Sequence, residues 1–72
     1  MIFMDEAEKE WFRELNAEAV KRRLDAKQWP IPEDEFDQRY SGGALDGWVD
    51  AYVEGLSPGE ALDQVYRAPM AE

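Results

Sequence analysis

The sequence contains no cysteine and no histidine, and these absences remove much of the chemistry by which small proteins act. Without cysteine there is no disulfide and no thiolate metal ligand, and without histidine the commonest nitrogen ligand and general base is missing. The two serines, Ser41 and Ser57, have no plausible base beside them in the sequence. A chain of 72 residues also offers little room for a desolvated pocket. We therefore expect neither an enzyme nor a protein that needs a metal or another cofactor.

Long apolar runs are also lacking. The first four residues are apolar, but Asp5 and Glu6 follow at once, and the basic region of a signal peptide is missing. No segment approaches the roughly 20 apolar residues of a membrane span. The absence of cysteine agrees with a reducing compartment. These features predict a cytoplasmic protein that does not enter a membrane.

Acidic residues are what the sequence has in excess. It holds 17 acidic and eight basic residues, for a net charge of −9. The excess is uneven, because residues 30–72 contain ten of the acidic residues and only two of the basic ones, Arg39 and Arg67. Such a surface repels nucleic acid and anionic membranes and attracts basic partners. We expect a protein partner with a basic surface and no direct binding of nucleic acid.

The apolar residues follow the period of a helix, which predicts an all-α fold for residues 1–72 as a single small domain. Asp5 and Glu8 have the spacing of a capping box, so a long N-terminal helix is expected to begin there. Prolines must end it by residues 29–32. A break near Asn16 is an alternative, since asparagine can cap a new helix. The expected apolar stripe consists of Trp11, Phe12, Leu15, Ala19 and Leu24, with Val20 at its edge.

Three shorter helices complete the expected bundle of three to four helices. Residues 32–40 form the second, and residues 44–54 form the third, whose apolar positions have the clearest helical spacing in the chain. Ser57 and Glu60 predict a capping box at the start of the fourth, and Pro69 is expected to stop it. Only residues 1–4 and 68–72 are expected to fray.

Two acidic groups are the candidate partner-binding residues. The first is a dense run that lacks the spacing of a calcium-binding loop and has the composition of a helix N-terminus: Glu33, Asp34, Glu35 and Asp37. The second is Asp46, Asp50 and Glu54, which a spacing of four places on one helix face with no Lys or Arg to offset it. That face is either simply solvated or a carboxylate ridge that binds cations on a partner.

The third helix also carries aromatic residues that bear on binding. Trp48 and Tyr52 lie on its apolar arc, together with Val53, and are expected either in the core or as anchors at an interface. Gly47 and Ala51 are small enough for another helix to approach closely. A homodimer through the third helix is therefore a second hypothesis.

The segment 34–52 resembles part of the ArdA antirestriction proteins, in which an acidic helix with spaced aromatics is followed by a second acidic amphipathic helix. The matching positions are Phe36, Tyr40, Gly42, Trp48 and Tyr52. Those proteins are longer and contain β-structure. In size and charge the chain is also similar to the anti-CRISPR proteins of phages and other mobile elements, which bind the nucleic-acid-binding surfaces of host defence complexes. The resemblance implies an acidic inhibitor, in part a DNA mimic.

The alternative belongs to another class of protein. It is a small helical adaptor or antitoxin-like regulator, either a monomer or a homodimer, that binds one protein through an apolar helix face. Salt separates the two hypotheses, because exposed charges are screened by salt and apolar contacts are not.

Overall fold

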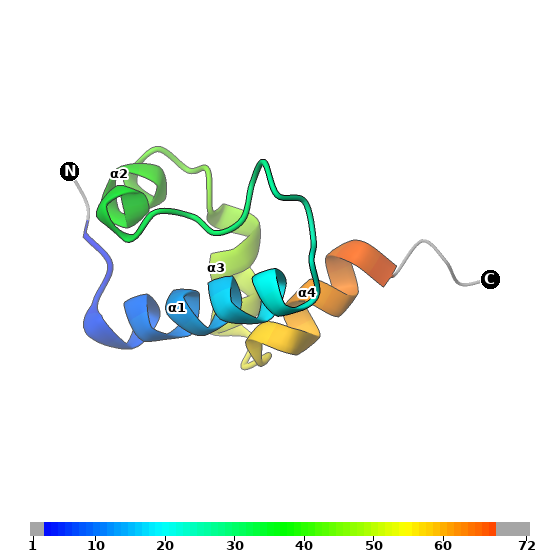
Figure 1. The fold of residues 1–72 in the computed structure, drawn as a ribbon. Coiled ribbons are helices and arrows are strands. Elements are labelled where there is room, and N and C mark those ends of the chain that lie inside the picture. The colour runs from blue at the N-terminus through cyan, green and yellow to red at the C-terminus, as the bar shows by residue number, and fades with distance from the viewer. Residues whose placement is uncertain (1–2, 68–72) are drawn as a thin grey trace.

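A computed structural model describes residues 3–67, which form four α-helices and one short 3₁₀ helix and contain no strand (Figure 1). This confirms the all-α prediction. The long helix α1 runs along one side of the molecule and packs against α4, while α3 also contacts α4. In chain order the elements are α1 (Glu6–Lys21), the 3₁₀ helix η1 (Glu33–Glu35), α2 (Phe36–Ser41), α3 (Asp46–Val53) and α4 (Pro58–Arg67).

The start of α1 has the predicted capping box. The Glu8 backbone N–H donates to the Asp5 carboxylate at 2.8 Å, and the Asp5 backbone N–H donates to the Glu8 carboxylate at 3.1 Å. Two backbone donors that a helix start leaves without partners are thus satisfied, which typically contributes about 1 kcal/mol. The predicted apolar stripe is confirmed at the four buried residues Trp11, Phe12, Leu15 and Ala19. Its fifth member, Leu24, lies beyond the end of α1 and is only partly buried.

The helix α1 is shorter than predicted and has no break at Asn16. It ends at Lys21, where Arg23 takes a left-handed backbone conformation and the Leu24 N–H returns to the Ala19 carbonyl. The Asn16 side chain points instead to the next segment. Its amide donates to the Ile31 carbonyl, and its oxygen accepts from the Ile31 N–H, both at 2.9 Å.

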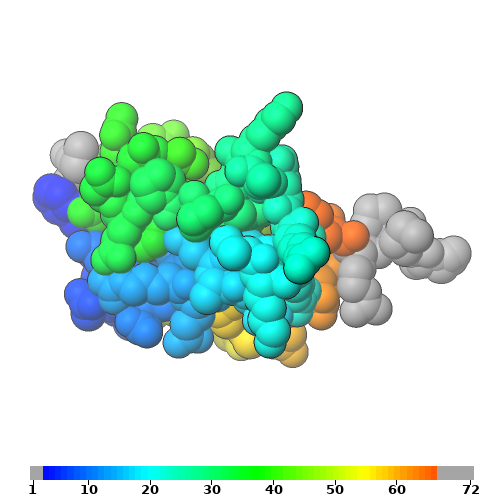
Figure 2. Space-filling model, in the orientation of Figure 1, coloured from blue at the N-terminus to red at the C-terminus, as the bar shows by residue number. Residues whose placement is uncertain are grey.

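The segment between α1 and η1 returns over the helix and contributes to the core. Figure 2 shows this segment and α2 lying above α1 on one face of the molecule. Trp29 and Ile31 are only 4% and 2% exposed. The Trp29 indole N–H donates to the Tyr66 hydroxyl of α4 at 3.0 Å, and its ring packs edge-on against Trp48 of α3. One aromatic side chain therefore joins this segment to two helices.

The other helix boundaries differ modestly from expectation. The second predicted helix is divided into η1 and α2, and α3 begins at Asp46, two residues later than expected. The capping box of α4 is confirmed, since Ser57 and Glu60 exchange hydrogen bonds between side chain and backbone. The predicted stop at Pro69 and the predicted fraying of residues 1–2 and 68–72 lie outside the described residues.

The prediction that Met4 frays is wrong. Its side chain is buried, and its backbone N–H donates to the Asp37 carboxylate of α2 at 2.9 Å. The sequence shows an apolar residue before a helix cap, and the fold uses that residue to join the start of α1 to α2.

Candidate functional site

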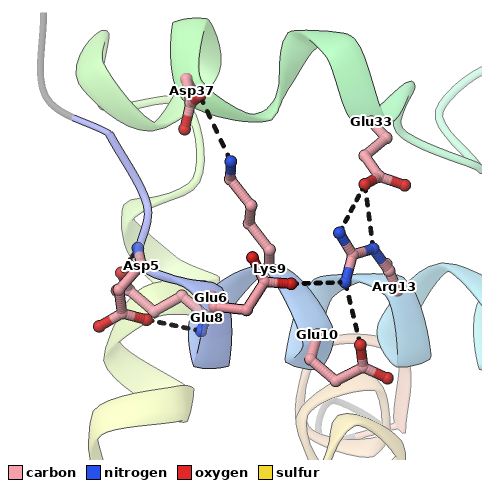
Figure 3. Close-up of polar contacts among 8 residues, drawn as sticks. All are labelled: Asp5, Glu6, Glu8, Lys9, Glu10, Arg13, Glu33 and Asp37. Carbon is pink, nitrogen blue, oxygen red and sulfur yellow. Dashed lines mark hydrogen bonds and ion pairs between the residues drawn. The ribbon is translucent and has the colours of Figure 1, made fainter.

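The acidic run at η1 and α2 is engaged mainly in ion pairs within the chain (Figure 3). Glu33 pairs with Arg13 at 2.7 Å, and Asp37 lies 3.8 Å from the Lys9 ammonium. Glu35 accepts from Arg39 one turn along, at 2.6 Å. Three of the four predicted binding residues in this run therefore have cationic partners of their own. Glu33 and Asp37 join η1 and α2 to α1, whereas the Glu35 pair lies within the η1–α2 segment.

Arg13 is the centre of this arrangement. Its guanidinium donates to Glu33 and also to Glu6 and Glu10, at 3.2 and 3.0 Å (Figure 3). Hydrogen bonds to Glu33 first, and then to the other two carboxylates, raise the pKa of Arg13. The hydrogen bond from Arg13 lowers the pKa of Glu33 below its ordinary value of 4.5. The sequence pattern did not reveal this role, because the residues come from segments 20 positions apart.

The pairing of Glu33 predicts a pH-dependent contribution to stability. A carboxyl group with a depressed pKa in the folded state stabilises the fold above its unfolded pKa, and this contribution is lost as pH falls through the folded value. We expect Glu33→Gln to lower the urea midpoint at pH 7, with the difference from the unmodified protein shrinking as pH falls below 4.5 and through the lowered pKa of Glu33. The matched control is Glu14→Gln, which removes an exposed carboxylate without an ion pair among residues 3–67. A pH-independent difference for Glu33→Gln would contradict the assigned role.

The α3 row, which we define as Asp46, Asp50 and Glu54, is different. All three residues are exposed, and none forms an ion pair within the described part of the chain. Asp34 shares this property. The structure thus divides the predicted acidic surface into a paired part and an unpaired part. Only the unpaired carboxylates keep their full charge available to a partner.

The position of Glu54 on α3 disfavours a purely structural explanation. Asp46 lies in the first turn, where an acidic residue is favourable at the positive end of the helix dipole. Glu54 is the C-cap, at the negative end, and the last turn of α3 contains no basic residue. The three carboxylates also repel one another at intervals of four residues. The row therefore costs stability at Asp50 and Glu54 without any compensating contact in residues 3–67.

The predicted aromatic anchors are largely used inside the molecule. Trp48 and Tyr52 are half-buried, and their rings pack edge-on against Trp29 and Trp11 at 5.5 and 5.8 Å. All three tryptophans thus contact the core. Aromatic edge-to-face pairs of this kind contribute about 0.5–1.5 kcal/mol beyond their burial. Only the outer parts of Trp48 and Tyr52 remain accessible to a partner.

Burial bears on two other predictions about α3. Val53 lies on the apolar arc that was expected either in the core or at an interface, and its 74% exposure excludes the core alternative for this residue. Ala51 is buried, so it does not form an exposed small-residue face with Gly47. Space around Gly47 is open, since an added Cβ would meet nothing within 4 Å. The helix thus presents Val53 beside the α3 row and lacks the close-approach stripe expected for a homodimer.

Glu8 and Tyr40 form a buried polar contact that sequence reasoning missed. Glu8 is the only charged residue among the buried side chains of residues 3–67. The charge of Glu8 first, and then burial and a hydrogen bond to Glu8, raise the pKa of Tyr40. The Glu8 carboxylate also completes the α1 capping box. These partners account for both groups as structural elements, so we do not assign them to the site.

The described residues thus make a small all-α protein in which the three carboxylates of the α3 row are exposed and form no ion pair. Within residues 3–67, no group of His, Cys, Asp and Glu side chains is arranged to hold a metal ion. No described helix is long and apolar enough to cross a membrane. No protein-family model, no curated protein and no solved structure matches the chain. Function is therefore inferred from the geometry of the site.

Proposed function

We propose that this is a small inhibitory binding protein of the anti-CRISPR or antirestriction type, acting in the cytoplasm. It would occupy a Lys- and Arg-rich surface that normally holds nucleic acid. The observation that carries the proposal is the α3 row, three exposed carboxylates without internal ion pairs in the described chain. The engaged acids of η1 and α2 support the fold and contribute background negative charge.

The geometry of the α3 row suits a basic groove. Residues four apart on a helix are about 6 Å apart along its axis, so the three carboxylates follow a line of roughly 12 Å. A DNA duplex presents one charge per about 1.7 Å, counting both strands. Over the same length of roughly 12 Å a duplex presents about seven charges, so the row supplies fewer than half of them, and several such rows or two subunits would be needed to imitate a duplex. Asp34 is a further unpaired carboxylate. Val53, at 74% exposure, adds an apolar contact next to Glu54.

Affinity capture at low salt tests this proposal. The tagged protein is incubated with a bacterial lysate, and bound proteins are eluted in a salt step and identified by mass spectrometry. We expect a nuclease, a CRISPR effector or another nucleic-acid-binding protein to be released by salt, because salt screens exposed charges beyond a Debye length of about 8–10 Å. Recovery of a nucleic-acid-free, non-basic partner that survives high salt would refute the inhibitor proposal.

The exposure of Val53 favours the second candidate, a small adaptor or antitoxin-like regulator that binds through an apolar face. In that case Val53→Ser would weaken partner binding more than removal of any one carboxylate of the α3 row. Under the inhibitor proposal, removal of a carboxylate of the α3 row would weaken partner binding more than Val53→Ser does. The same captured partner can be used for both comparisons.

A further inference from the structure

Three helices of this protein end in the same backbone motif. In each, the N–H of the second residue beyond the cap returns to a carbonyl five positions earlier, and the N–H before it returns to a carbonyl three positions earlier. The first residue beyond the cap must adopt a positive φ for these two hydrogen bonds to form. It is Gly43 after α2 at 85°, Gly55 after α3 at 88°, and Arg23 after α1 at 59°.

Arg23 is the exception among these three positions. The left-handed conformation is open to glycine, whereas a Cβ disfavours it. The chain itself shows the usual solution twice, at Gly43 and Gly55. The Arg23 side chain is exposed and forms no hydrogen bond or ion pair within residues 3–67. Its backbone conformation therefore costs stability, and in return the described fold gains no contact, only a positive charge near the negative end of the α1 dipole.

The basic residues without ion pairs lie together in the sequence. Lys9, Arg13, Arg22 and Arg39 each pair with at least one carboxylate. Lys21, Arg23 and Lys27 form no ion pair in the described part of the chain, and all three are exposed. Of the seven basic residues whose side chains the structure describes, four thus have an acidic partner and three do not. These three lie within residues 21–27, which also contain the paired Arg22 and the exposed Asp25, and we call residues 21–27 the basic segment.

We propose that the basic segment is a second docking surface, which binds carboxylates on a protein partner. It is distinct from the α3 row and does not depend on the proposed function. Arginine suits this role because its planar guanidinium can bind a carboxylate through two parallel hydrogen bonds. Surfaces of opposite sign on one small protein also fix the orientation of a partner, because the reversed arrangement juxtaposes like charges.

A protein surface fits this segment better than nucleic acid does. Proteins that bind single strands stack bases on exposed aromatic rings, but the aromatic residue nearest in sequence, Trp29, is only 4% exposed. The dense phosphate line of a nucleic acid would also meet the net charge of −9. Carboxylates on a protein are local, so they can meet the basic segment without bringing a long line of negative charge near the rest of the molecule.

Arg23→Gly tests the premise that the arginine is retained at a cost to the fold. We expect its Tm to rise by roughly 4–8 °C, because glycine relieves the positive φ. The binding probe is an oligoglutamate peptide, titrated into isotopically labelled protein at about 0.15 M salt so that long-range repulsion is screened. Chemical shifts of residues 21–27 should move on titration. Arg23→Gln keeps the backbone conformation and should weaken this binding about two- to fivefold.

Three controls make the result decisive. Arg39→Gln removes a base that is already paired with Glu35, so it should leave oligoglutamate binding unchanged. Asp50→Lys should not reduce it, which separates this surface from the α3 row. A DNA duplex should cause no comparable shifts in residues 21–27. Equal loss in the Arg39 and Arg23 variants, stronger binding of the duplex, or no gain of Tm in Arg23→Gly would overturn the proposal.

Discussion

Replacing Phe12 with alanine is expected to remove most of the stability of this protein. The Phe12 side chain is fully buried and packs against Trp11 at 5.2 Å and against Phe36 of α2 at 5.9 Å. A Phe→Ala change in a packed core costs about 3–5 kcal/mol, and proteins have about 0.05–0.15 kcal/mol of stability per residue. For a chain of 72 residues, the loss is comparable with the whole. Urea unfolding followed by tryptophan fluorescence measures it.

The matched control is Val20→Ala, on the same helix. Val20 is 50% exposed, so its truncation should change the free energy of unfolding by less than about 0.5 kcal/mol. If Phe12→Ala and Val20→Ala had similar urea midpoints, the position of Phe12 at the junction of α1 and α2 would be wrong.

Asp50→Lys is expected to weaken capture of a basic partner and to stabilise the fold at the same time. Asp50 is flanked at intervals of four by Asp46 and Glu54, so a lysine there turns two repulsive pairs into attractive ones. Each such change is worth about 0.2–0.5 kcal/mol, so Tm should rise slightly. The association rate with the captured partner should fall by about tenfold or more at low salt, because steering by the α3 row is lost. Surface plasmon resonance at two salt concentrations measures the rate.

Glu14→Lys is a close control for Asp50→Lys. It makes the same change in net charge, and Glu14 is likewise exposed and flanked at intervals of four by Glu10 and Glu18. It should leave most of the association rate intact, since it lies on α1 and not on α3. Equal slowing by both variants would show that only net charge matters, and would contradict a binding role for the α3 row. Adding Glu54→Lys to Asp50→Lys should deepen the loss without unfolding the protein.

The helices and their caps could be predicted from sequence because local chemistry determines them. The capping boxes of α1 and α4 and the buried stripe of α1 follow from residues within a few positions of one another. The early end of α1 could not be predicted in this way. It depends on Arg23 accepting a positive φ and on the Asn16 side chain binding Ile31, 15 residues away.

The candidate site could be predicted only in part, for a similar physical reason. The spacing of Asp46, Asp50 and Glu54 was enough to place them on one exposed face of α3. Whether Glu33 and Asp37 form ion pairs could not be predicted, because their partners Arg13 and Lys9 come from α1. Sequence shows how many charges a segment has. The tertiary fold decides which of them are neutralised.

The packing of Trp29 on Trp48 has a spectroscopic consequence. Their ring centroids are 5.5 Å apart and the ring planes are inclined by 73°. We expect two indoles held so close to couple their excited states and to add a paired positive and negative band to the far-ultraviolet circular dichroism. This band overlaps the helical signal, so ellipticity alone misstates the helix content. The paired band can also be used to follow unfolding, since it is expected to disappear when the segment carrying Trp29 separates from α3.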